Sequence, residues 1–154
     1  MAAEFLKLNA KEQQDTINAA APTLAMLPAV LEKDVWICLV LNVLFAIPGR
    51  RPVVFKGGTS LSKVFNLINR FSEDIDISVN FLQDYEQPIS KTKASHIREE
   101  IEANLQKYKE TILIPSLKEA ATTYGEVLDI ESGESEWEIH VNYKNRFWQP
   151  VLGT

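Results

Sequence analysis

The chain has 154 residues, of which 45% are hydrophobic and 24% are charged. This balance is typical of one globular domain with a hydrophobic core, and it excludes disordered and fibrous proteins. Cys38 is the only cysteine and there are two histidines, so neither a disulfide framework nor a zinc site of cysteine and histidine can be assembled.

The net charge of -5 argues against a surface that binds nucleic acid all round, but it is compatible with a local basic cleft. The N-terminus lacks a secretion signal and the apolar run over residues 35–41 is too short to cross a bilayer, so we expect a cytoplasmic protein without a membrane partner.

The first third of the chain carries helical signals. Asn9 is a suitable N-cap for a first helix that ends at residue 20, and Pro22 suits the first turn of a short second helix. A third helix is predicted over residues 32–47. That stretch is apolar nearly all round, with only Asn42 polar in its middle, which indicates a helix packed on several sides inside the domain.

A strand, a glycine turn and a further helix are predicted next. Residues 52–55 are apolar after the initial proline and indicate a short strand, which is followed by the pair Gly57 and Gly58. Beyond the glycines, apolar residues recur at helical spacing as far as Ile68. Residues 74–79 alternate strictly between polar and apolar side chains, which predicts a half-buried strand returning beside the first.

The second half of the chain is expected to begin with helices and to end with a hairpin. A long charged helix is predicted from Ser90, and another helix follows Pro115 and ends at Gly125. Two strands are predicted over residues 127–130 and 137–141, joined by a turn-rich segment.

Two aspartates in the predicted strand carry the main chemical signal. A two-residue period places Asp74, Asp76 and Ser78 on one face, so both carboxylates point the same way. Their Cα atoms would lie roughly 6.5 to 7 Å apart, which lets both side chains converge on a pair of metal ions about 3.5 to 4 Å apart. Oxygen ligands without sulfur favour Mg²⁺ or Mn²⁺ over zinc. The alternative interpretation is that two exposed aspartates only cover a solvated strand face.

The glycine turn is a candidate phosphate site. Gly57 and Gly58 follow a strand and open a helix with Thr59 or Ser60 as N-cap, so backbone N–H groups and the positive helix end could face a phosphate. The segment is not a Walker A loop, because it lacks the second glycine before the lysine. The stretch is locally cationic in an acidic protein, although a solvated rim is an equal alternative for each of these residues: Arg50, Arg51, Lys56, Lys63 and Arg70.

Taken together, the two motifs resemble a known signature. Phe55-Lys-Gly-Gly-Thr-Ser-Leu-Ser-Lys63 and Arg70-Phe-Ser-Glu-Asp-Ile-Asp-Ile-Ser78 are similar to the AbiEii/AbiGii-type nucleotidyltransferase toxins of the polymerase-beta-like superfamily. Glu32-Lys-Asp34 before the apolar helix is similar to the N-terminal region of that family. The resemblance is strong over residues 31–79 and weaker through the predicted hairpin.

The resemblance implies a mixed α+β nucleotidyltransferase fold, with a small mixed β-sheet flanked by helices and with helices at the N-terminus. It implies that Asp74 and Asp76 bind Mg²⁺ as catalytic residues, and that the triphosphate of a nucleoside triphosphate is bound by residues of the glycine turn: Gly57, Gly58 and Thr59 or Ser60, with Lys56 and Lys63 beside them. Members of the family act as toxins neutralised by a separately encoded antitoxin, and some transfer nucleotides to tRNA ends. The expected activity is therefore transfer of a nucleoside monophosphate to an RNA or protein hydroxyl.

The third carboxylate of the superfamily site has no clear counterpart. Asp129 or Glu138 would supply it if its strand lay beside Asp74. Residues 1–154 are expected to form one catalytic domain that lacks the family's C-terminal helical half. Two other classes therefore stay open: a non-catalytic module that binds a nucleotide or a partner, and a purely structural protein. His140 is assigned no role.

Overall fold

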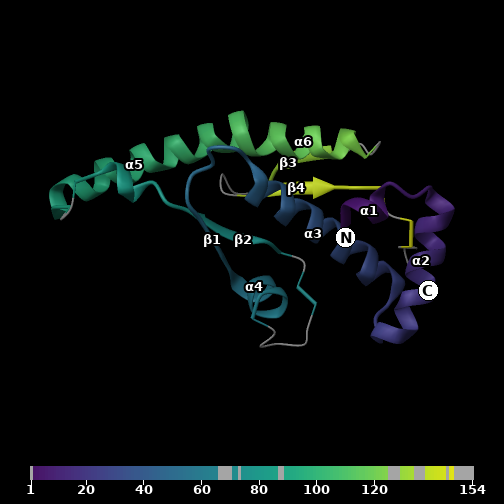
Figure 1. Ribbon diagram of the computed structural model, residues 1–154. Helices are drawn as coiled ribbons and strands as arrows, with labels where there is room; N and C mark the ends of the chain where they lie inside the picture. The colour runs from purple at the N-terminus through teal and green to yellow at the C-terminus, as the bar shows by residue number, and fades with distance from the viewer. Residues whose placement is uncertain are drawn as a thin grey trace, which may run out of the picture.

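The computed structural model describes residues 2–65, 71–72, 74–86, 89–124, 129–133, 138–144 and 146–147. In these ranges the chain is mostly helical and carries two antiparallel sheets of two strands each (Figure 1). The predicted mixed α+β class is confirmed. No helix in the described ranges is long and apolar enough to cross a membrane.

Two helices open the chain, α1 (Ala2–Leu6) and α2 (Ala10–Leu24). The Asn9 side chain accepts a hydrogen bond from the Glu12 N–H, and the Glu12 carboxylate accepts one from the Asn9 N–H. This reciprocal capping box confirms the predicted start of the helix. The predicted break before Pro22 is wrong, because Pro22 lies in the last turn of α2, where its missing N–H costs a single intrahelical hydrogen bond.

The apolar helix α3 (Pro28–Ala46) is the centre of the fold. It begins earlier than the predicted residue 32, because Pro28 occupies its first turn, where a proline is well tolerated. It packs against α1, α2 and α6, which confirms the prediction that it is covered on several sides. Its buried residues are Glu32, Trp36, Ile37, Leu39, Val40 and Leu44.

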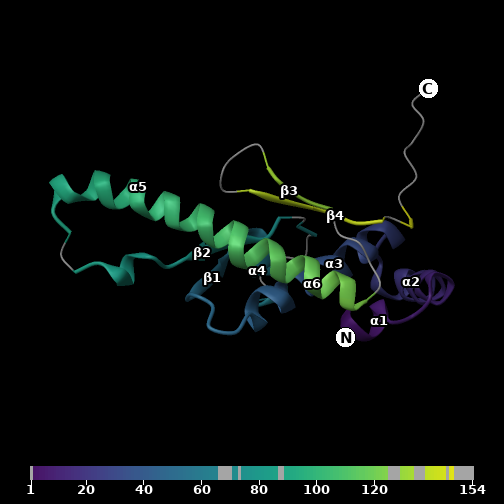
Figure 2. The same cartoon turned by 90° about the horizontal axis from the view of Figure 1, so that it is seen from above.

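One continuous rod follows the short 3₁₀ turn η1 (Leu82–Asp84) (Figure 2). It consists of α5 (Lys91–Tyr108), the π-helical turn η2 (Lys109–Leu113) and α6 (Ile114–Thr123). The predicted start is confirmed, since Ser90 caps α5. The predicted helix at Pro115 is confirmed as α6, which has Pro115 in its first turn and follows η2 without a break. A proline lacks the donor for a regular helical hydrogen bond and clashes with the preceding turn, and the wider π turn just before Pro115 absorbs that conflict.

Four short strands form the two sheets. In the first sheet β1 (Val53–Lys56) pairs antiparallel with β2 (Asp76–Val79), and in the second β3 (Asp129–Ser132) pairs antiparallel with β4 (Ile139–Asn142). The pairing of β1 with β2 and the hairpin of β3 with β4 were both predicted. β4 begins two residues later than expected, and residues 127 and 128, the predicted start of β3, lie outside the described residues. The predicted helix residue Ile68, the turn around residue 135 and the helix end at Gly125 lie outside the described residues.

The expected single mixed sheet is wrong, since the described strands form two separate sheets, β1 with β2 and β3 with β4. Both sheets pack apolar residues against the core around α3 and α6. These residues are Ile75 and Ile77 in and just before β2, and Ile130, Ile139 and Val141 in the second sheet. Each sheet thus buries a face instead of joining edges, which is how such short strands gain stability.

The segment after β4 is tied back to α3. The Tyr143 ring stacks on Trp36 with ring centroids 5.0 Å apart. Glu32, which is 2% exposed, accepts hydrogen bonds at 3.0 and 3.1 Å from the backbone N–H of Arg146. The N-terminal third and the end of the described chain therefore share one core.

Candidate functional site

The first sheet and the residues just before β2 present two carboxylates on one exposed face. Ile75 and Ile77 pack against the core cluster, whereas Asp74 and Asp76 are exposed. The predicted alternation of faces is therefore confirmed, although β2 begins only at Asp76. The register places Lys56 directly opposite Asp76, and cross-strand partners project from the same face.

The glycine bend lies directly against one of these carboxylates. Gly57 has a φ of 74°. Residues with a Cβ rarely adopt this left-handed backbone conformation. A Cβ placed on Gly57 would stand 1.9 Å from Oδ2 of Asp76 and 2.8 Å from its Cγ. Only glycine fits here, because any larger residue would displace the carboxylate. The sequence prediction that the glycine turn and the acidic strand meet is thus confirmed at Gly57 and Asp76.

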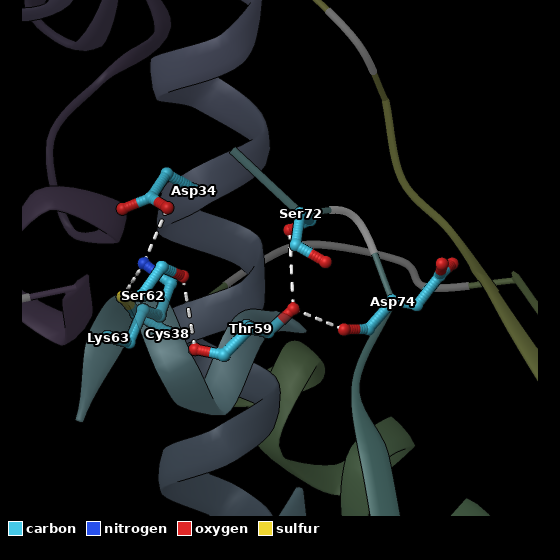
Figure 3. A network of polar contacts seen from close by, with 7 residues as sticks. All are labelled: Asp34, Cys38, Thr59, Ser62, Lys63, Ser72 and Asp74. Carbon is cyan, nitrogen blue, oxygen red and sulfur yellow. Dashed lines mark hydrogen bonds and ion pairs between the residues drawn. The ribbon is translucent and has the colours of Figure 1, made fainter. Parts of the chain in front are cut away.

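The two hydroxyl residues after the glycines do not cap the helix. The helix α4 (Gly57–Lys63) begins at Gly57 with Lys56 as N-cap, so the predicted cap at Thr59 or Ser60 is wrong. Their exposed fractions are 0% and 3%. The Thr59 hydroxyl donates to the backbone carbonyl of Asp74 (Figure 3). That contact joins residues 15 positions apart, and no local pattern in the sequence announces it.

Lys63 lies on the far side of α4 from Asp74 (Figure 3). Its ammonium group forms an ion pair with Asp34 of α3, in which 22% and 32% of the two side chains are exposed. The same ammonium is 3.6 Å from Sγ of Cys38. Lys63 therefore fastens α4 to α3, and it is not brought to the carboxylates. Sequence reasoning missed Asp34 as its partner, because the two residues are 29 positions apart.

The arginines of the cationic stretch are engaged elsewhere. Arg50 donates to the carbonyl of Phe45 and lies over its ring. Arg51 forms an ion pair with Asp84 at 2.8 Å and stacks on another ring, that of Phe81, at 4.2 Å from the centroid. Arg70 lies outside the described residues. Among the described cations of this stretch, Lys56 shares a strand face with a carboxylate, that of Asp76.

No third carboxylate joins Asp74 and Asp76 within the described ranges. Asp129 lies on β3 and Glu138 just before β4, and both strands belong to the separate second sheet. Glu138 is instead 3.9 Å from Nε2 of His140. Neither candidate is therefore brought to the first sheet.

The two aspartates fit a divalent cation that prefers oxygen ligands. Both are exposed, and in the described part of the chain neither side chain forms an ion pair that would neutralise it. Uncompensated neighbouring carboxylates repel one another and bind cations such as Mg²⁺ or Mn²⁺. A Cβ at Gly57 would overlap the Asp76 carboxylate, so glycine lets that carboxylate lie against the backbone of the bend.

A family model matches most of the chain. The family model described as the nucleotidyl transferase AbiEii toxin of a type IV toxin–antitoxin system matches residues 40–148, which is more than half of the chain. The match includes both sheets and the glycine bend, and it begins after the segment of residues 32–34. Neither curated proteins nor solved structures gave a match. The chain therefore belongs to the AbiEii nucleotidyl transferase toxin family.

Proposed function

We propose that the chain transfers a nucleoside monophosphate from a nucleoside triphosphate to a hydroxyl group of an RNA, such as a tRNA 3′ end, or of a protein. Family membership implies nucleotidyltransferase activity, a nucleoside triphosphate substrate and an antitoxin partner. The observation that carries the proposal is the contact between the glycine bend and Asp76. This contact supports a site in which the backbone of the bend and the carboxylates lie side by side, as phosphoryl chemistry requires.

In the proposed reaction an acceptor hydroxyl attacks the α-phosphorus and pyrophosphate leaves. Asp74 and Asp76 would hold the divalent cation typical of the family, which supplies charge neutralisation at the phosphates when bound. Gly57 and Gly58 would admit the triphosphate close to the backbone. Lys56 shares the face of Asp76, from which its ammonium would pair with a phosphate oxygen.

Ser60 and Lys63 would act differently from the residues that face solvent. Ser60 is buried, and Lys63 is held by Asp34. Lys63 would support the glycine bend by fastening α4 to α3, and Ser60 by filling a buried position in α4. The triphosphate would then be bound by backbone N–H groups and Lys56.

A second candidate function is a non-catalytic module that binds a nucleotide or a partner. It is favoured by one observation, namely that no third acidic ligand accompanies Asp74 and Asp76 within the described residues. Such a module binds nucleoside triphosphate in the presence of Mg²⁺ and releases no pyrophosphate. Calorimetry combined with a pyrophosphate assay separates the two candidates.

The test of transfer uses labelled nucleoside triphosphates with tRNA and with protein fractions as acceptors. Asp76→Asn should abolish Mg²⁺-dependent labelling and pyrophosphate release, because it removes a charged oxygen ligand while retaining the shape of the side chain. Asp15→Asn is the matched control, since Asp15 is an exposed residue of α2 outside the proposed site. Full labelling by the Asp76 variant would refute the assignment of Asp76.

A further inference from the structure

A buried hydroxyl holds the backbone of one of the two carboxylate residues. Thr59 is 0% exposed, and its Oγ1 donates to the carbonyl oxygen of Asp74. The carbonyl oxygen of Ser72 lies 3.5 Å from the same Oγ1. In Figure 3 the Asp74 carboxylate points away from Thr59, so the contact fixes the main chain of Asp74 and leaves its acidic group free to face solvent.

This contact lies where the sheet gives no support. The pairing of β1 with β2 ends at Lys56 opposite Asp76, so Asp74 lies beyond the last paired position. Backbone groups outside a ladder need another partner or water to fix their direction. The Thr59 hydroxyl supplies that partner from α4.

The helix that carries Thr59 is itself anchored. The ion pair between Lys63 and Asp34 fastens α4 to α3, and the Ser62 hydroxyl donates to the Thr59 carbonyl at 3.2 Å. A chain of contacts thus runs from the central helix through α4 to the backbone of Asp74.

We propose that Thr59 is a positioning residue that sets the direction of Asp74 relative to Asp76 and acts without touching the nucleotide. This inference rests on the proposed function, because it assigns Thr59 to the same acidic site. It differs from the sequence prediction that Thr59 binds triphosphate, since a fully buried hydroxyl committed to a carbonyl has no free face for a phosphate. The cation affinity of the site then depends on a hydroxyl that is not a ligand.

The experiment measures the Mg²⁺ midpoint of pyrophosphate release and the Mg²⁺-dependent thermal shift of the full chain. Thr59→Val keeps the shape and removes the hydroxyl, and it should raise the Mg²⁺ midpoint about fivefold to tenfold, the size of effect expected for one lost hydrogen bond. Thr59→Ser retains the hydroxyl and should return the midpoint to within about twofold of wild type. Thr59→Ala serves as a second variant without the hydroxyl if the valine variant does not fold.

Two controls separate positioning from general stability. Thr16→Val makes the same chemical change at an exposed site, where Thr16 Oγ1 donates to the Glu12 carbonyl at 2.7 Å, and it should leave the midpoint unchanged. Leu117→Val removes a methylene from a buried position in α6 and should lower Tm without moving the midpoint.

The outcomes distinguish the two levels of the proposal. A wild-type midpoint in Thr59→Val or Thr59→Ala, or equal effects of valine and serine, would overturn the role of Thr59 while leaving the proposed function intact. A midpoint that shifts in Leu117→Val as much as in Thr59→Val would also overturn it. A wild-type chain that shows neither Mg²⁺-dependent thermal shift nor pyrophosphate release would refute the proposed function, and the inference with it.

Discussion

Alanine at position 57 tests the contact on which the proposed site depends. Gly57 has a φ of 74°, and Gly49, in the turn after α3, has a φ of 64°. An added Cβ at Gly57 would lie 1.9 Å from Oδ2 of Asp76, whereas at Gly49 nothing lies within 4 Å. The two glycines therefore share the backbone penalty for alanine and differ in the clash with the carboxylate.

The expected magnitudes follow from these two terms. A left-handed backbone conformation costs alanine roughly 1–2 kcal/mol, so both variants should lose about that much stability, or about 2–4 °C in Tm for each kcal/mol. In Gly57→Ala alone the new Cβ would also lie 1.9 Å from Oδ2 of Asp76. The carboxylate must therefore move until the two atoms reach an ordinary contact beyond 3.4 Å. A misplacement of about 1 Å in a reacting site reduces rates on the order of 100-fold, so transfer should fall by at least that factor.

The assay compares three chains: wild type, Gly49→Ala and Gly57→Ala. Thermal melts with and without Mg²⁺ give the stability loss and the metal-dependent shift, and pyrophosphate release gives the rate. Gly49→Ala should be less stable than wild type but retain both the shift and the rate, and Gly57→Ala should lose both. The reasoning is refuted if Gly57→Ala binds Mg²⁺ and releases pyrophosphate as well as Gly49→Ala does.

Two predictions concern the contacts that support the site from α3. In a double-mutant cycle of Lys63→Met and Asp34→Asn, thermal unfolding should give a coupling energy of about 1 kcal/mol, because the pair is partly exposed and screened; strict additivity would contradict the ion pair. Glu32→Gln should lower the free energy of unfolding by about 1–3 kcal/mol in urea titrations, because a buried charged acceptor of the Arg146 N–H becomes neutral. Its Mg²⁺ midpoint should stay at the wild-type value, because the contact between Glu32 and Arg146 lies outside the proposed site. A large shift of the midpoint would contradict this.

Much of the fold follows from local patterns in the sequence. Asn9 and Ser90 are helix caps whose effect needs only neighbouring residues, and the alternation around Ile77 encodes the buried face of β2. The helix ends and joints were predicted less well. Pro22 was interpreted as a helix start but lies in the last turn of α2, whereas Pro115 lies in the first turn of α6 as predicted. At Pro22 tertiary packing of the helix overrides the local cost of proline.

The site divides in the same way between local and distant contacts. The meeting of the glycine bend with Asp76 was predictable, because a strand, a turn and a returning strand bring the two together. The ion pair of Lys63 with Asp34 and the hydrogen bond of Thr59 to the Asp74 carbonyl were not predictable. Partners 29 and 15 positions away leave no periodic signal in the sequence. The separation of the strands into two sheets was equally unpredictable, because alternation specifies which face of a strand is buried and not which strand lies beside it.

The tie between Glu32 and the Arg146 backbone also bears on how the chain is made. The two residues are 114 positions apart, so a ribosome releases the acidic partner long before its amide donor exists. During that interval the carboxylate is better hydrated than enclosed, since burial of an ion without its hydrogen-bond donors is strongly unfavourable. Enclosure of Glu32 is therefore expected to wait for synthesis of the segment after β4, which makes it a late event in biogenesis.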